Sequence, residues 1–193
     1  METAENKSAC YASGAPFNVE GPDAALHQVV IVGGGAGGIE LATKLGDTLG
    51  KKGRAAITLI EKTQSHFWKP HLHEIAAGSM DLGTYEINHL AQSYWHGYRY
   101  RYGEVVGIDR EKQTVTTAPY IDEHGEEVIA PRVFHYDTLV ISIGSLTNDF
   151  GTPGVKEHAI ALETAQQAAR FHRRCWDRNL GSKATEPSSH RRV

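Results

Sequence analysis

The sequence predicts an α/β fold with a parallel sheet, and three observations lead to that prediction. An aliphatic run over residues 27–32 ends in a glycine-rich turn, a helical pattern follows the turn, and a β-rich run over residues 57–60 comes next. Strand, turn, helix and strand within about 35 residues form a βαβ unit with a right-handed crossover. With 40% hydrophobic and 22% charged residues, the 193-residue chain has enough apolar material to bury a core.

Each element of this unit has its own signal. The first run is aliphatic and is closed by glycines, as in a strand buried on both faces of a parallel sheet. Leu41, Leu45 and Leu49 recur every fourth residue and predict a helix that ends between Gly50 and Gly53. Residues 66–70 are expected to form a loop. Helices are expected over residues 71–77, 87–95 and 163–174.

An antiparallel β-meander is predicted as an insertion into this α/β fold. The β-rich runs cover residues 98–102, 105–108, 114–117 and 127–134, with turns between them. A last apolar strand over residues 138–143 stops at a glycine. Residues 1–26 are expected to be a flexible leader, residues 27–174 the folded domain, and residues 175–193 a polar tail.

Composition excludes several classes of function. The formal charge is -3, from 20 basic and 23 acidic residues, so the chain has no general field for nucleic acid. The two cysteines, Cys10 and Cys175, form no C-x-x-C pair, which argues against zinc ribbons and disulfide scaffolds and for a reduced, cytoplasmic compartment. His71 and His73 lie two positions apart, so on a helix they diverge, and we expect no metal site.

The glycine turn is the main candidate binding element. Gly33, Gly35 and Gly38 form a G-x-G-x-x-G pattern between a strand and a helix, which is the context that gives this pattern meaning. The first glycine permits the tight turn, the second lets the backbone approach a pyrophosphate, and the third lets the helix pack against the strand. The predicted diphosphate-binding residues are Gly33, Gly34, Gly35, Ala36, Gly37 and Gly38.

An acid at the end of the second strand supports a dinucleotide. Glu61 lies 23 positions after Gly38, close to the usual spacing of about 20. Its carboxylate is expected to accept both ribose hydroxyls of an adenosine and to repel a 2′-phosphate, although the adjacent Lys62 weakens that repulsion. The turn and the acid alone suit NAD and FAD equally well.

Two further segments, residues 66–78 and 144–155, resemble the type II NADH dehydrogenases, which are NADH:quinone oxidoreductases of the two-dinucleotide flavoprotein superfamily. The resemblance implies a Rossmann-like FAD-binding domain, with FAD as cofactor and NADH and quinone as substrates. It also implies further cofactor-binding residues: Lys69, Pro70, Val106, Ser142, Gly144 and Ser145. No catalytic side chain is expected, because the flavin ring carries the electrons.

The chain departs from the family in one respect. It contains no second G-x-G-x-x-G, so the NADH-binding domain is expected to be absent and the chain to be a truncated amino-terminal fragment. Complete members are expected to lie peripherally on the cytoplasmic face of the inner membrane, and the uncovered domain face here to favour self-association. The alternative is a dinucleotide-binding fragment without activity of its own.

Other nucleotide-binding and redox classes fit less well. A disulfide reductase needs a redox cysteine pair, and no cysteine lies between Cys10 and Cys175. A short-chain dehydrogenase needs a lysine four residues after a tyrosine, and a P-loop needs glycine-lysine-serine/threonine after its glycines. Neither pattern occurs in the sequence.

Overall fold

The computed structural model describes residues 18–20, 26–81 and 85–183, and describes side chains over residues 26–81 and 85–177. The chain divides into two compact units. Unit 1 comprises Met1–Gln64 and Leu90–Ile143, and unit 2 comprises Ser65–His89 and Gly144–Val193. The sequence predicted one folded domain over residues 27–174, and its limits stay a prediction.

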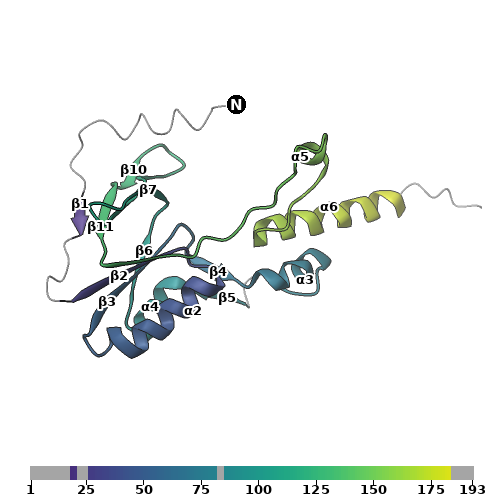
Figure 1. Cartoon of the computed structure of the whole chain (residues 1–193). Helices are drawn as coiled ribbons and strands as arrows, with labels where there is room; N and C mark the ends of the chain where they lie inside the picture. The colour runs from purple at the N-terminus through teal and green to yellow at the C-terminus, as the bar shows by residue number, and fades with distance from the viewer. Residues whose placement is uncertain (1–17, 21–25, 82–84, 184–193) are drawn as a thin grey trace, which may run out of the picture. The chain divides into compact units, whose positions relative to one another are not determined.

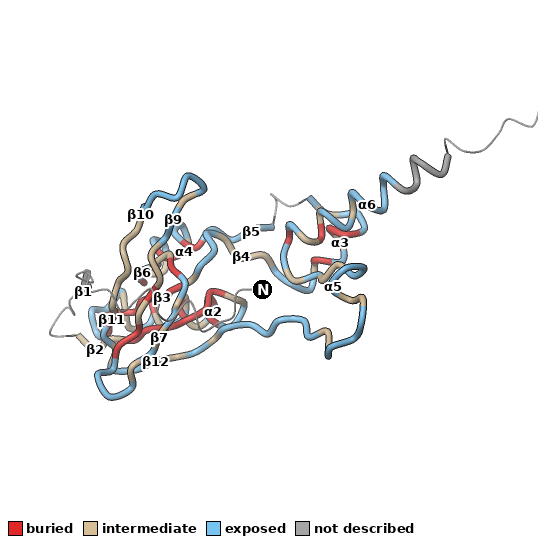
Figure 2. The backbone as a smooth tube through the Cα atoms, turned by 90° about the horizontal axis from the view of Figure 1, so that it is seen from above, coloured by how far each residue is buried: buried red, intermediate tan, exposed pale blue. Residues whose placement is uncertain are grey.

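The parallel sheet of unit 1 is confirmed (Figure 1). Its strands are β2 (His27–Val32), β3 (Ala55–Glu61), β6 (Arg99–Tyr102) and β12 (Thr138–Ile141), in the order β12-β2-β3-β6. Side chains alternate between the two faces of a strand. Val29 and Ile31 accordingly belong to one core cluster and Val30 and Val32 to another. Figure 2 shows the resulting band of buried backbone along β2 and β3.

The helix after the glycine turn is α2 (Ala36–Leu45), and it continues as a π-helix, η2 (Gly46–Gly50). The helical segment ends at Gly50, within the predicted limits of Gly50 and Gly53, whereas the change of helix type was not predicted. Glycines at this point let another chain segment come close. A Cβ at Gly46 would lie 2.1 Å from the His96 carbonyl oxygen, and one at Gly50 would lie 2.2 Å from that of Gly97.

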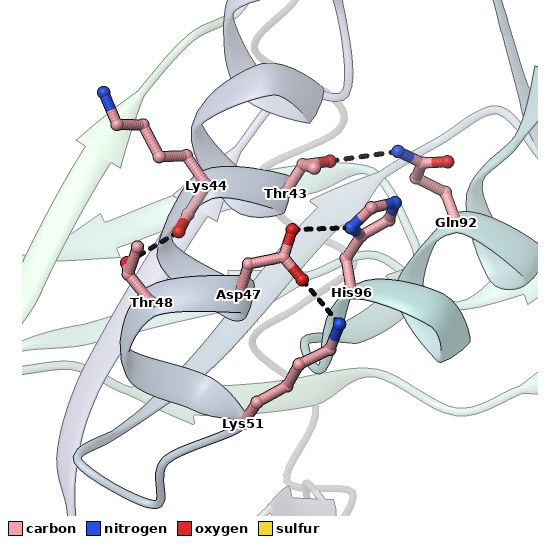
Figure 3. Close-up of polar contacts among 7 residues, drawn as sticks. All are labelled: Thr43, Lys44, Asp47, Thr48, Lys51, Gln92 and His96. Atoms are coloured by element: carbon pink, nitrogen blue, oxygen red, sulfur yellow. Dashed lines mark hydrogen bonds and ion pairs between the residues drawn. The ribbon is translucent and has the colours of Figure 1, made fainter.

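That neighbouring segment is the end of α4 (His89–His96), and polar contacts fix it (Figure 3). Asp47 accepts a hydrogen bond from His96 at 2.8 Å and pairs with Lys51 at 2.6 Å. The Gln92 amide donates to the Thr43 hydroxyl at 3.1 Å. The hydrogen bonds from Lys51 and then His96 lower the pKa of Asp47.

The predicted meander is confirmed in part. The second sheet of unit 1 has the order β1-β11-β8-β7 and consists of β1 (Asn18–Glu20), β11 (Arg132–His135), β8 (Thr114–Thr117) and β7 (Val105–Asp109). A hairpin of β9 (Tyr120–Ile121) and β10 (Glu127–Ile129) lies between β8 and β11 in the sequence. The assignment of residues 98–102 to the meander was wrong. Residues 99–102 form β6, which follows α4 and pairs parallel with β3.

Unit 2 contains short elements. They are β4 (Ser65–Phe67), η3 (Lys69–His71), α3 (Leu72–Ala77), β5 (Glu86–Asn88), α5 (Val155–His158) and α6 (Ala165–Lys183). β4 pairs with β5, so residues 66–70 are not the loop that was expected, and α4 begins two residues later than predicted. The predicted helix over 163–174 continues to Lys183. A small core joins α3 to α6 through Leu72, Ile75, Ala76, Ala165 and Ala168.

Among the described residues, no helix combines the length and the hydropathy needed to cross a lipid bilayer.

Candidate functional site

Gly33 and Gly38 fix the geometry of the glycine turn between β2 and α2. Gly33 has φ of +103°, and a Cβ there would lie 2.5 Å from the Ser142 carbonyl oxygen. A Cβ at Gly38 would lie 1.8 Å from the Gly33 carbonyl oxygen. No other residue fits at either position, because real Cβ atoms do not approach backbone atoms this closely. The predicted close packing of helix and strand at Gly38 is therefore present.

The start of α2 provides backbone donors. Ile39 is the first residue whose amide donates along the helix, to the Gly35 carbonyl oxygen at 2.9 Å. The amides of residues 36–38 precede it and have no acceptor within the helix. The first turn of α2 contains no acidic side chain. An added Cβ at Gly35 would meet nothing within 4 Å, so the backbone is open to an approaching anion at this point.

Glu61 lies directly at this turn. Its Oε2 accepts a hydrogen bond from the Gly34 amide at 2.6 Å. Its Oε1 accepts from the Lys62 amide at 2.9 Å and from the amide and hydroxyl of Thr63, both at 3.1 Å. A carboxylate has about four lone-pair sites. Oε2 thus has room for one ribose hydroxyl, whereas Oε1 already accepts three hydrogen bonds and has no site left for a second.

The neighbouring strand supports the residues that follow Glu61. The Tyr100 hydroxyl donates to the Thr63 carbonyl oxygen at 2.7 Å, and the Gly103 amide donates to the Glu61 carbonyl oxygen at 3.1 Å. Burial, and then the negative charge of Glu61, raise the pKa of Tyr100 to about 12, so its hydroxyl stays protonated and can donate. Lys62 pairs with Glu104 at 3.6 Å.

Sequence reasoning missed Thr63 and Tyr100. The alternating tyrosines of residues 98–102 were a usable signal, but only once β6 was known to lie beside β3.

Two other predicted residues lie in unit 1. The Ser142 amide donates to the Val32 carbonyl oxygen at 2.7 Å, and the Ser142 hydroxyl lies 3.3 Å from where a Cβ of Gly37 would be. The last strand therefore returns to the glycine turn, as the resemblance implied. Val106 is 45% exposed and lies where the register between β7 and β8 shifts.

The remaining predicted residues lie in unit 2. Lys69 and Pro70 belong to η3, and the Lys69 ammonium lies 3.6 Å from where a Cβ of Gly144 would be. Ser145 is exposed in the segment that follows. The Glu163 carboxylate accepts a hydrogen bond from the Thr147 amide in the same segment. Hydrogen bonds from Thr147 first, and the charge of Lys69 to a smaller extent, lower the pKa of Glu163.

Comparison with curated proteins finds close relatives for most of the chain. It is 45% identical over 146 residues to a type II NADH:quinone oxidoreductase of Haemophilus influenzae, a match that covers 76% of this chain and 33% of the relative. It is 28% identical over 152 residues to one of Staphylococcus epidermidis, covering 78% of this chain and 34% of the relative. The resemblance seen in the sequence is thereby confirmed. The chain spans about a third of the length of these relatives.

Solved structures share the fold. The sulfide:quinone oxidoreductase of Aquifex aeolicus matches with a TM-score of 0.64 and 24% identity, covering 80% of this chain and 32% of that one. NDH2 of Plasmodium falciparum matches with a TM-score of 0.64 and 19% identity, covering 85% of this chain and 31% of that one. Residues 27–180 match the family model described as pyridine nucleotide-disulphide oxidoreductase. The chain therefore belongs to the pyridine nucleotide-disulphide oxidoreductase family.

Proposed function

We propose that this chain is the FAD-binding part of an NADH:quinone oxidoreductase. The observation that carries the proposal is the open backbone at Gly35, beside the first amides of α2 and the Glu61 carboxylate. The 45% identity to a type II NADH:quinone oxidoreductase supports FAD over NAD as the dinucleotide at this turn. When bound, FAD would supply the acceptor for hydride from NADH and the donor of two electrons to a quinone.

The residues present fit this cofactor. The amides of residues 36–38 and the positive end of the α2 dipole suit a diphosphate. Oε2 of Glu61 suits a ribose hydroxyl, while Gly34 and Thr63 hold that carboxylate at the turn. The other residues proposed to line the cofactor are Gly33, Gly37, Gly38, Lys62, Lys69, Pro70, Val106, Ser142, Gly144 and Ser145.

Gly35→Ala tests the site without disturbing the fold. An added methyl group meets no protein atom within 4 Å, but it takes up the space through which a diphosphate would approach. We expect the wild-type chain, purified with FAD, to show the flavin absorption bands. We expect Gly35→Ala to bind FAD at least about tenfold more weakly, with unchanged circular dichroism and melting temperature.

The matched control is Gly107→Ala, where an added Cβ would lie 3.9 Å from its nearest neighbour, the Cβ of Thr116. It should bind FAD like the wild type. A wild-type chain without flavin absorption after incubation with FAD, or a Gly35→Ala variant with undiminished affinity, would contradict the proposal.

A second candidate function is dinucleotide binding without turnover. The single G-x-G-x-x-G in the sequence favours it, since one such turn holds one dinucleotide. An NADH oxidation assay with a soluble quinone distinguishes the two candidates. A chain that shows flavin absorption but no NADH oxidation above that of free FAD supports the second.

The cellular location proposed for the protein rests on the same family resemblance. We propose a cytoplasmic location, with peripheral membrane association as part of a complete enzyme. Leu146 and Phe150 of unit 2 are 81% and 86% exposed, which supports self-association through an apolar face.

A further inference from the structure

We propose that Glu104 is a specificity-determining residue of the glycine turn, because it pairs with Lys62 and so keeps that lysine from attracting a 2′-phosphate. The ligands favoured are dinucleotides whose adenosine ribose has a free 2′-hydroxyl. This inference rests on the proposed function for the position of the ribose at Glu61, and it adds the class of ribose that the turn accepts.

Lys62 is the basic side chain next to Glu61 in the sequence. The 2′- and 3′-carbons of a ribose are adjacent, so with either hydroxyl at Glu61 a 2′-phosphate would lie beside this carboxylate. An acid at this place suits a free 2′-hydroxyl, whereas a nearby cationic side chain accommodates a 2′-phosphate. Glu61 and Lys62 alone have no net charge. Discrimination between the two kinds of ribose therefore requires a further negative charge beside Lys62.

Glu104 supplies this charge. Its Oε1 lies 3.6 Å from Nζ of Lys62. The side chains of Lys62 and Glu104 are 62% and 61% exposed, so the pair lies at the surface, where a ligand can approach. Together with Glu61, the three side chains are two carboxylates and one ammonium, with a net charge of -1.

Backbone hydrogen bonds hold Glu104 at this place. The amide of Gly103, the residue before it, donates to the Glu61 carbonyl oxygen at 3.1 Å. The Glu104 carbonyl oxygen accepts a hydrogen bond from the Ala118 amide at 2.8 Å. Gly103 is buried, and a Cβ there would lie 3.2 Å from the Cβ of Thr117. The backbone at Glu104 is thus tied both to the end of β3 and to the residue after β8.

Two arginines lie near the same end of β3, where Tyr102 is paired with Glu61, but their guanidinium groups are bound to the backbone. Arg101 donates to the carbonyl oxygen of the preceding residue at 3.3 Å, and Arg132 donates to the Tyr102 carbonyl oxygen at 2.5 Å. Both arginines are half-buried, whereas Lys62 is exposed. Lys62 is therefore the cation that is free to turn towards a ribose phosphate once Glu104 is removed.

Two probes that differ in one group test the proposal on the full chain. ADP-ribose and 2′-phospho-ADP-ribose share the adenosine and the diphosphate, and isothermal titration calorimetry measures the dissociation constant of each. We expect the wild type to prefer ADP-ribose by about tenfold or more. Glu104→Gln should reduce this preference by about threefold or more, through tighter binding of 2′-phospho-ADP-ribose and with unchanged affinity for ADP-ribose. Added salt should narrow the difference between the two proteins, because it screens exposed charges.

The matched control is Glu111→Gln, which removes the same charge from an exposed glutamate beyond the opposite end of β7. It should keep the wild-type preference. The double variant Lys62→Gln/Glu104→Gln removes the cation as well, so it should regain the preference of the wild type. Exposed ion pairs contribute little to stability, so all these variants should fold like the wild type, as circular dichroism would show.

Three results would overturn the inference: an unchanged preference in Glu104→Gln, an equal change in Glu111→Gln, or a double variant that behaves like Glu104→Gln. A chain that shows the expected preferences for the two probes but does not bind FAD would support the inference and contradict the proposed function alone. A chain that binds FAD with a preference independent of Glu104 would do the reverse. A chain that binds neither the probes nor FAD would contradict both.

Discussion

Units 1 and 2 both contribute predicted cofactor-binding residues, but they differ in how firmly those residues are supported. In unit 1, β2 and β3 are buried on both faces, and Ile31 and Leu59 have no exposed surface at all. In unit 2, the core consists of two helices joined by five residues, three of them alanine. Buried apolar area, and with it the hydrophobic contribution to stability, is therefore greater in unit 1.

The difference bears on how a dinucleotide would be bound. The glycine turn of unit 1 is fixed by backbone packing, as the close approach of Gly38 to Gly33 shows. Lys69 and Gly144 of unit 2 depend instead on a short 3₁₀ helix and on a segment held by the Glu163 carboxylate. We infer that the glycine turn of unit 1 is preorganised for a diphosphate.

Core substitutions should have the largest effects and should show whether the two units unfold separately. Leu59→Ala removes a side chain with no exposed surface and should lower the free energy of unfolding by about 2–5 kcal/mol. Ile75→Ala should instead increase hydrogen exchange in residues 65–81, 85–89 and 144–183 only. Leu90→Ala, at an exposed leucine, is the control and should change stability by less than about 0.5 kcal/mol. Equal loss of protection in unit 1 on Ile75→Ala would show that the chain unfolds as one unit.

Two glutamates extend the comparison of the two units, because the carboxylate of each accepts a hydrogen bond from a backbone amide. Glu61 does so in unit 1 and Glu163 in unit 2. Glu61→Gln removes the charge that strengthens the bond from Gly34 and should cost about 1 kcal/mol, measured by urea denaturation. Glu163→Gln should have a smaller effect on stability but should speed hydrogen exchange near Thr147.

The effect of Glu163 should also depend on pH. Its pKa is lowered in the folded state, so its contribution is present above its ordinary value of 4.5 and disappears as the pH falls through the folded value. Wild type and Glu163→Gln should therefore converge in stability at low pH. A difference that stays constant down to pH 3 would show that the charge of Glu163 plays no part.

The βαβ unit could be predicted from the sequence because its signals are local. The aliphatic run, the spacing of the glycines and the leucines at 41, 45 and 49 each report on a few neighbouring residues, and Glu61 follows from its position at the end of a strand. Contacts between distant segments could not be predicted this way. The pairing of β6 with β3, and of β4 with β5, depends on how the chain returns after a helix or a loop.

The same limit applies inside the site. The position of Glu61 was predictable from the sequence. The hydrogen bonds that its carboxylate accepts from Gly34 and Thr63 were not, since side-chain hydrogen bonds depend on the conformation of the turn. The π-helical end of the first helix was missed for a similar reason. Gly50 was interpreted as a helix-ending residue, whereas in the structure Gly46 and Gly50 also make room for the end of α4.

Two tyrosines of unit 1, Tyr98 and Tyr100, test whether the buried polar groups of that unit have hydrogen-bond partners. Among the described residues the buried Tyr98 hydroxyl has no hydrogen-bond partner, whereas the Tyr100 hydroxyl donates to Thr63. Tyr98→Phe should therefore leave stability at pH 7 unchanged or raise it by up to about 1 kcal/mol, and Tyr100→Phe should lower it by about 1 kcal/mol. Urea denaturation of both variants measures the difference.

Alkaline pH should change the result for Tyr98. Burial raises its pKa from 10.0 to about 12, so ionisation is easier in the unfolded chain than in the folded one. The contribution of the protonated hydroxyl to stability is complete below pH 10 and is lost as the pH rises towards 12. Tyr98→Phe cannot ionise at this position, so it should lose less stability than the wild type between pH 9 and pH 11. If both proteins lose the same amount, the Tyr98 hydroxyl is not buried in solution, and the core of unit 1 is less complete than the comparison with unit 2 requires.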